Sequence, residues 1–353
     1  MFALKCYLYR SVSEGPPMFR LTRLRFAAPV AAALLLALAA CSNDTDAAAP
    51  AATTPAVHIS TAYELPDAQA YPESIAADGR SGAIYLSSFL DGAVYRATPG
   101  KQQAEVFLPA GADGRQTANG VKVDAAGRLW VIDHTHGVAV YDTGTRALIA
   151  RFDVREAQPF VNDLAITADG TVYLTDSVRP VIYRITPQQF GDAVAHGGRA
   201  ELSTFSDLGP AKDAAAQNAT ALNGLVVDST GRYLLAVDMP NGDLYRVALD
   251  GQQSIRKVTL HGGSMVDGDG LELRGDTLWV VHNKSDAISR WRITDDGATA
   301  ELQQRVTDPA LDIPTSIVHV GDRALVAISQ FDKNGPYGAG TPGPFTVAAV
   351  DGI

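Results

Sequence analysis

Six polar residues stand at intervals along the chain, and each opens a short apolar stretch. Five of them carry a carboxylate or a carboxamide, the hard oxygen groups that Ca²⁺ prefers in sets of six to eight together with water. No Cys cluster or paired-His spacing accompanies them, so zinc is not favoured. The residues could therefore share a calcium ion, with another divalent cation as the alternative. They are Glu73, Asn119, Asn162, Asn223, Asp269 and Thr315.

These opening residues recur because the chain consists of repeated units. Successive ones are 46, 43, 61, 46 and 46 positions apart. After each comes an apolar stretch, a turn containing Asp or Gly, a second apolar stretch, and two further strands. Six units of four strands are typical of a six-bladed β-propeller. Two β-sandwich domains are the alternative, but they do not explain a period that continues across the whole chain.

The sequence thus predicts an all-β domain over residues 58–353, with four antiparallel strands in each blade. The sixth unit lacks a fourth strand before the chain ends, and residues 57–65 form a strand-like segment without a unit of its own. We expect this N-terminal strand to complete the sixth blade and close the ring. The innermost strands would then begin at one face, where the opening residues converge.

Several of these residues also have a simpler interpretation. Asn-Gly, Asn-Asp and Asp-Gly are common turn dipeptides, although their recurrence at one point of successive units favours a shared site. Asn119, Asp163, His134 and His282 are candidates for contacting substrate or supporting the ligands. Each His could transfer protons or could simply be a solvated loop residue. The Gly- and Pro-rich segment 332–344 is expected to be a mobile loop.

The set of openings resembles one known family. Glu in the first unit, Asn-Asp in the third, Asn-Gly in the fourth and Asp-Gly in the fifth are similar to the regucalcin/gluconolactonase group of calcium-dependent propellers, over about residues 60–352. The resemblance implies that Ca²⁺ is bound by Glu73, Asn162, Asn223 and Asp269. It also implies hydrolysis of a lactone or related ester, with the metal polarising the carbonyl and Asp269 as the candidate catalytic base.

One departure bears on the substrate. Sugar-lactonase relatives carry an Arg two residues before the Asn of the third blade, whereas Phe160 occupies that position here. This favours an apolar substrate over a sugar lactone. Related propellers without catalytic activity also open a blade with a similar Asn-Asp. The alternative function is therefore a non-catalytic propeller that binds a ligand or a protein partner at the same face.

The N-terminus predicts export. Residues 26–40 are apolar and follow three arginines, which is typical of a secretory signal over residues 1–40, with Met18 as the better start. About 15 apolar residues are short for a membrane span. Leu38–Cys41 is similar to a bacterial lipobox, which predicts lipidation of Cys41 and a flexible tether over residues 41–57.

We therefore expect a monomer in the bacterial cell envelope, facing the periplasm and bound to the outer membrane only through its lipid. From Cys41 onward the chain has 24 basic and 38 acidic residues, a formal net charge of −14. This argues against nucleic acid as a partner, because nucleic-acid binding requires basic patches. The expected partner is a small lactone or ester. Removal of Cys6 with the signal leaves Cys41 alone, so no disulfide is expected.

Overall fold

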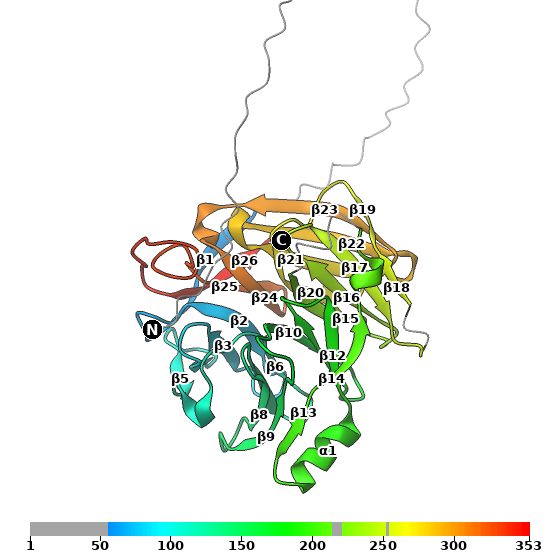
Figure 1. Cartoon of the computed structure of the whole chain (residues 1–353). Coiled ribbons are helices and arrows are strands. Elements are labelled where there is room, and N and C mark those ends of the chain that lie inside the picture. The colour runs from blue at the N-terminus through cyan, green and yellow to red at the C-terminus, as the bar shows by residue number, and fades with distance from the viewer. Residues whose placement is uncertain (1–55, 214–220, 252–253) are drawn as a thin grey trace, which may run out of the picture. The chain divides into compact units, whose positions relative to one another are not determined.

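The computed structural model describes residues 56–213, 221–251 and 254–353, in which six β-sheets form a ring (Figure 1). The first strand of each sheet contacts the first strands of the sheets on either side, so these six strands surround the centre. The predicted all-β, six-bladed propeller is confirmed. The predicted signal peptide and the lipidation site lie outside the described residues, as does most of the tether.

The first three blades use residues 72–207. Blade 1 contains β2 (Pro72–Ala77), β3 (Ile84–Ser88), β4 (Val94–Ala97) and β5 (Glu105–Leu108). Blade 2 contains β6 (Val121–Val123), β7 (Arg128–Asp133), β8 (Gly137–Asp142) and β9 (Leu148–Asp153). Blade 3 contains β10 (Val161–Ile166), β11 (Val172–Asp176), β12 (Val181–Ile185) and β14 (Ser203–Asp207).

The remaining blades use residues 222–351 together with the first strand of the chain. Blade 4 contains β15 (Leu222–Val227), β16 (Tyr233–Asp238), β17 (Asp243–Ala248) and β18 (Ile255–Lys257). Blade 5 contains β20 (Gly268–Arg274), β21 (Thr277–His282), β22 (Ala287–Thr294) and β23 (Thr299–Thr307). Blade 6 contains β24 (Pro314–Val320), β25 (Arg323–Ile328), β26 (Thr346–Asp351) and, outermost, β1 (His58–Glu64), which pairs antiparallel with β26.

Backbone pairing also crosses between blades at alternate positions around the ring. β13 (Arg199–Glu201) pairs in parallel with β9, and the chain then continues into blade 3. β19 (Thr259–His261) follows β18 of blade 4 and pairs in parallel with β23 of blade 5. A single parallel bridge joins Glu64 in blade 6 to Gln103 beside blade 1. Blades 2 and 5 thus have five strands each, one more than the four that the sequence predicts.

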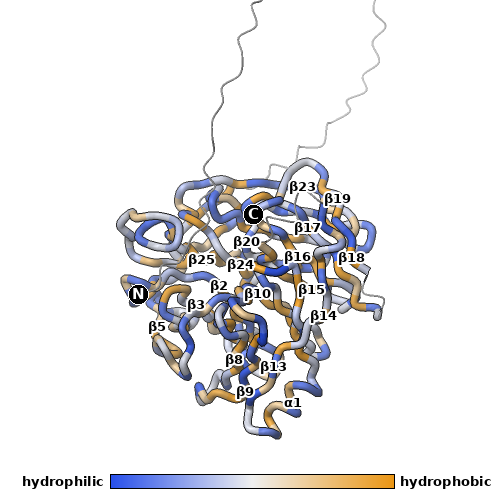
Figure 2. Tube along the Cα trace, in the orientation of Figure 1, coloured by the Kyte–Doolittle hydropathy of each residue, from blue (hydrophilic) through white to orange (hydrophobic). Residues whose placement is uncertain are grey.

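The core lies between the blades. The buried apolar residues form six clusters, and each cluster draws on two adjacent blades. Figure 2 shows that β25, the second strand of blade 6, is hydrophobic, whereas β23, the fourth strand of blade 5, is largely hydrophilic. The helix α1 (Pro187–Ala195) adds to one cluster, where Phe190 packs 5.5 Å from the ring of Trp130. Six separate interfaces therefore hold the central residues in place.

Candidate metal centre and active site

The opening residues lie at irregularities in the inner strands. In blade 1 the register changes between Pro72, which pairs with Ser88, and Ile75, which pairs with Leu86. The inner strands of blades 3, 4, 5 and 6 change register at the corresponding point. Such β-bulges redirect side chains and are frequent beside active sites. In these blades the opening residues thus belong to strands, and the turn interpretation is wrong for them.

The glycines after three opening residues allow neighbouring inner strands to approach closely. A Cβ atom on Gly224 would lie 2.2 Å from the carbonyl oxygen of Asp269 in the next blade. A Cβ on Gly120 would lie 2.7 Å from the carbonyl oxygen of Asn162, and one on Gly270 equally close to that of Thr315. A side chain at any of these positions would separate the strands. These glycines therefore set the width of the central ring.

Asp163 and Ser74, each one position after an opening residue, connect adjacent blades. Asp163 Oδ1 accepts a hydrogen bond from the Leu164 amide (2.8 Å), and its Oδ2 accepts one from the Leu225 amide of blade 4 (3.2 Å). Ser74 Oγ accepts from the Val121 amide of blade 2 in the same way (3.2 Å). Burial raises the pKa of Asp163, and these amides oppose that rise. Asp163 is thus a buried link between blades 3 and 4.

Glu73 and Asp269 are two buried carboxylates, close enough that the charge of Asp269 acts on Glu73. Burial is the main cause of the raised pKa of Glu73, and the charges of Asp269 and Asp163 add to it. Burial also raises the pKa of Asp269, while hydrogen bonds from Asn283 and Asn223 partly offset this rise. The two groups therefore repel each other in a poorly solvated position, and a cation between them would relieve both effects.

Asn162 supplies an oxygen that has no partner. Its Nδ2 donates to Ser177 Oγ (2.8 Å), and Ser177 Oγ donates in turn to the Leu222 carbonyl (2.7 Å). The Oδ1 atom of Asn162 is buried and accepts no hydrogen bond, and the same holds for Asn283 Oδ1. Buried polar atoms nearly always have partners, so an unsatisfied oxygen in a ring that also carries two buried carboxylates needs an explanation. A bound cation would provide it.

The donor types decide which cation would fit. In the described part of the chain, no three His, Cys, Asp or Glu side chains are grouped so as to hold a metal ion. An ion here must therefore combine the two carboxylates with carboxamide oxygens. Glu73, Asp269, Asn162 and Asn223 provide such a set of hard oxygens, which suits Ca²⁺ better than a transition metal.

A second row of side chains supports the opening residues of blades 2 to 5. In each of these blades the residue that follows the second strand contacts the opening residue of the same blade. The donor–acceptor distances are 3.1 Å for His134 Nδ1 and Asn119, 2.8 Å for Ser177 and Asn162, 3.6 Å for Met239 Sδ and Asn223, and 2.8 Å for Asn283 and Asp269. Sequence reasoning missed all of these except His134.

The model of the SMP-30/gluconolactonase/LRE-like region matches residues 71–326, which is more than half of the chain. The chain belongs to this family. No curated protein sequence matches it. Among solved structures, a gluconolactonase from Xanthomonas campestris is similar with 16% identity and a TM-score of 0.58, over 84% of this chain and 89% of that one.

Two other propellers in solved structures are similar to this member of the SMP-30/gluconolactonase family. Regucalcin from Agrobacterium tumefaciens, described as a calcium-binding protein, has 16% identity and a TM-score of 0.57, over 83% of this chain and 94% of that one. Virginiamycin B lyase from Staphylococcus aureus has 12% identity and a TM-score of 0.52, over 84% and 99%. At these identities the likeness shows a shared fold.

The two candidate histidines of this family member lie in different surroundings. His134 contacts Asn119 at the ring, and burial lowers its pKa to about 4, so it is neutral at pH 7. His282 is fully buried inside blade 5, where its ring nitrogens lie 2.8 Å from the Val266 carbonyl and 2.7 Å from Ser289 Oγ. His282 thus holds strands of blade 5 together, and its neighbour Asn283 is the residue that reaches Asp269.

The segment 332–344, expected to be mobile, is folded against the ring. Tyr71 Oη donates to the Lys333 carbonyl (2.7 Å), and the Gln330 side chain bonds both Gly343 and Pro344 at the far end. Between these anchors Tyr337 Oη lies 3.4 Å from Nδ2 of Asn283. The segment is thus anchored at both ends by Tyr71 and Gln330, which lie outside its own Gly- and Pro-rich sequence, and its mobility stays a prediction.

Thr315, the sixth opening residue, joins the ends of the ring. Its Oγ1 donates to the Pro72 carbonyl of blade 1 (3.2 Å).

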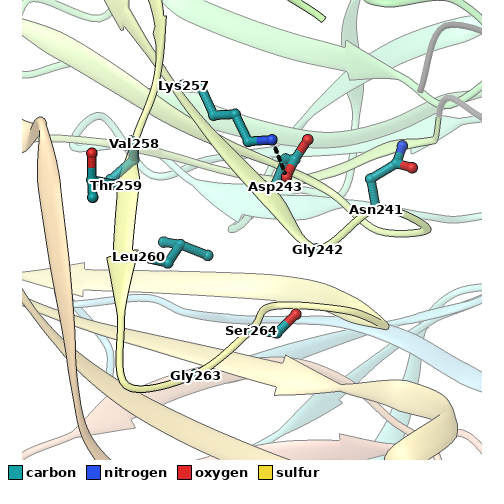
Figure 3. Close-up of a pocket in the computed structure, with 9 residues that line it drawn as sticks. All are labelled: Asn241, Gly242, Asp243, Lys257, Val258, Thr259, Leu260, Gly263 and Ser264. Carbon is teal, nitrogen blue, oxygen red and sulfur yellow. Dashed lines mark ion pairs between the residues drawn. The ribbon is translucent and has the colours of Figure 1, made fainter. Parts of the chain in front are cut away.

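A separate hollow of about 430 Å³ lies at the outer edge, where β18 continues into β19 (Figure 3). Its charged groups are already paired, since Lys257 Nζ lies 2.8 Å from Asp243 and 3.0 Å from Asp213. The central ring is therefore the better candidate site.

Proposed function

We propose that this chain hydrolyses a lactone or a related ester at the central ring, with Ca²⁺ held by Glu73, Asn162, Asn223 and Asp269. The observation that carries the proposal is the unpartnered Asn162 Oδ1 at the start of one inner strand, in a ring whose inner strands also carry two buried carboxylates of raised pKa. Membership of the SMP-30/gluconolactonase/LRE-like family supports it. So do the printed descriptions of two structural neighbours, one a gluconolactonase and the other a calcium-binding protein.

The residues of the chain would divide the chemistry between them. When bound, the ion would polarise the substrate carbonyl as a Lewis acid. Asp269 would accept a proton from water as a general base, since a positioned carboxylate can take up a proton in the transition state. The hydrogen bond from Asn283 would orient Asp269 during this step.

The bond changes balance without a further reactant. The water oxygen forms a bond to the carbonyl carbon, and the bond from that carbon to the ester oxygen breaks. The proton held by Asp269 then passes to the departing oxygen. The product of a lactone is the corresponding hydroxy acid.

The test combines metal binding with turnover. Purified protein is stripped with a chelator and titrated with Ca²⁺, while unfolding and the hydrolysis of lactones and aryl esters are measured. A ligand that binds only the folded state stabilises it by about 2.7 kcal/mol at a hundredfold excess over the dissociation constant. We expect Ca²⁺ to stabilise the wild type and to support hydrolysis of at least one substrate. We expect neither effect in Glu73→Gln. Asp142→Asn, in an exposed turn, is the control.

Two outcomes would contradict the proposal. A metal-free protein that is not stabilised by Ca²⁺ would show that the ring is not a cation site. Turnover that persists unchanged in both Glu73→Gln and Asp269→Asn would place the chemistry elsewhere.

Envelope anchoring through a lipid on Cys41 is also part of the proposal and rests on the sequence alone. Within the described residues, no helix has the length and apolar character needed to cross a membrane. Mass spectrometry of the N-terminal peptide from the bacterial membrane fraction tests the lipid. A peptide that retains residues before Cys41 would contradict it. Sedimentation of the soluble domain tests the expected monomer.

A further inference from the structure

Five rings from four blades form a continuous aromatic border beside the central ring. We call Phe89, His134, Phe160, Phe331 and Tyr337 the aromatic rim. The rings of His134 and Phe160 are parallel within 5° at 4.4 Å, and Phe89 lies 5.5 Å from His134 on a plane tilted by 25°. Phe89 also lies 5.2 Å from Phe331, which lies 5.5 Å from Tyr337. The contacts are within the range of favourable aromatic pairs.

The aromatic rim is joined to the candidate site at two points. His134, between Phe89 and Phe160, has its Nδ1 3.1 Å from Asn119 Oδ1. At the end of the rim, Tyr337 Oη lies 3.4 Å from Asn283 Nδ2, and the same nitrogen donates to Asp269. A substrate whose carbonyl approached Asp269 would therefore have the aromatic rim beside it.

The rim remains partly open, so its rings can contact a ligand. Phe89, His134 and Phe160 are half-buried, although each is in contact with another ring. Phe160 is fixed by its backbone, since its carbonyl accepts a hydrogen bond from the Ser177 amide (2.8 Å). Two residues further along the chain is Asn162, the residue with the unpartnered oxygen.

Apart from the Tyr337 hydroxyl, which lies against Asn283, the aromatic rim has almost no polar groups to offer. Phe89, Phe160 and Phe331 have no hydrogen-bonding side-chain atoms, and His134 is uncharged at neutral pH because burial lowers its pKa to about 4. A hydroxyl group buried against these rings would lose its bonds to water without replacement, whereas an apolar group would lose nothing. Such a surface discriminates against polyhydroxylated molecules.

We propose that the aromatic rim binds an apolar group of the substrate, so that the site takes aryl- or alkyl-substituted lactones and esters in preference to sugar lactones. This rests on the proposed hydrolase function. Phe160 and Phe89 are the specificity-determining residues, because they flank His134 and lie on the partly open side of the stack.

The first arm of the test compares three substrates in the presence of Ca²⁺: γ-phenyl-γ-butyrolactone, unsubstituted γ-butyrolactone and glucono-δ-lactone. We expect kcat/KM for the phenyl lactone to exceed that for either other substrate by about tenfold or more. Phe160→Ala should lower kcat/KM about tenfold for the phenyl lactone and leave it unchanged for the other two substrates. Phe160→Leu should restore part of the lost kcat/KM. Leu148→Ala, exposed on the outer strand β9, is the matched control.

The second arm measures binding without turnover, so that the two proposals can fail separately. The phenyl-substituted and unsubstituted five-membered lactams are unreactive analogues whose affinities calorimetry can report. Tighter binding of the phenyl lactam that depends on Phe160 supports the inference even if no lactone is hydrolysed. The inference is overturned if glucono-δ-lactone is the preferred substrate, or if Phe160→Ala weakens the binding of all ligands equally. Either result leaves the proposed hydrolase function standing. Thermal unfolding of each variant verifies that it is folded.

Discussion

Asn283 Nδ2 donates a 2.8 Å hydrogen bond to Asp269 Oδ2, across the 14 residues that separate the start of β20 from the end of β21. The bond opposes the effect of burial on the pKa of Asp269. It also fixes one carboxylate oxygen, and Asn223 gives the carboxylate a second hydrogen bond. The equivalent residues of three other blades contact their own opening residues in the same manner.

This bond predicts that Asn283 controls cation affinity. Asn283→Ala removes the donor that orients Asp269, and loss of such a supporting residue typically weakens metal binding by about 10- to 100-fold. Calorimetric titration with Ca²⁺ would measure the change. Asn334→Ala, in an exposed part of the loop, should bind as the wild type does. Equal affinities for Asn283→Ala and wild type would show that the bond does not position Asp269 for the ion.

The raised pKa values of Glu73 and Asp269 predict how stability depends on pH. The folded state without cation binds protons at these sites more tightly than the unfolded chain does. This contribution is fully present below about pH 4, the ordinary carboxyl range, and is lost as pH rises through the raised folded-state values. Chelated protein should therefore lose part of its stability between pH 5 and 8.

Thermal unfolding at several pH values, with chelator or with Ca²⁺, would test this dependence. Saturating cation should flatten it, because the ion replaces the protons. The double variant Glu73→Gln, Asp269→Asn should show a flatter profile without any cation. If stability depends on pH equally steeply in the chelated wild type and in the double variant, the dependence arises from other groups.

The close approach of inner strands predicts a strong effect of one methyl group. Gly224→Ala would place Cβ 2.2 Å from the Asp269 carbonyl oxygen and 2.7 Å from Leu271 Cγ. Overpacking of this kind destabilises a protein by about 1–3 kcal/mol. Denaturant unfolding would measure the loss. Gly79→Ala is the control, since its Cβ would meet no atom within 4 Å. Equal stabilities would mean that the ring can widen freely.

Substitutions of the two histidines are expected to have different effects, one on stability and the other on ligand binding. His282→Ala leaves the Val266 carbonyl without its partner and removes one of the two partners of Ser289 Oγ, which keeps its bond from Trp291 Nε1, and should lower the free energy of unfolding by about 1–3 kcal/mol. Calcium affinity, measured below the unfolding temperature, should change little. His134→Ala interrupts the aromatic rim. It should therefore weaken the binding of a phenyl-substituted ligand while changing the free energy of unfolding little. A large loss of calcium affinity in His282→Ala would contradict this division.

The repeat, the strand order and the positions of the opening residues could be predicted because they depend on local patterns. Alternating apolar stretches and turn residues recur in each unit, and a polar residue precedes the first stretch. The supporting residue Asn283 could also have been found, since its spacing from the opening residue, 14 positions, is close to the 15 positions between Asn162 and Ser177.

Other features depend on contacts that no local pattern encodes. Asp163 bonds to the Leu225 amide 62 residues later, so its position between blades could not be read from the Asn-Asp dipeptide. Tyr71 anchors a loop 262 residues away. β13 and β19 pair in parallel with neighbouring blades, although their short sequences carry no sign of the change.

These parallel pairings have a mechanical consequence. They join blade 6 to 1, blade 2 to 3 and blade 4 to 5 through backbone hydrogen bonds, so the blades are coupled in three pairs. Glu73 belongs to the first pair, Asn162 to the second, and Asn223 and Asp269 to the third. An ion held by all four residues would therefore connect the three pairs of blades at a single point.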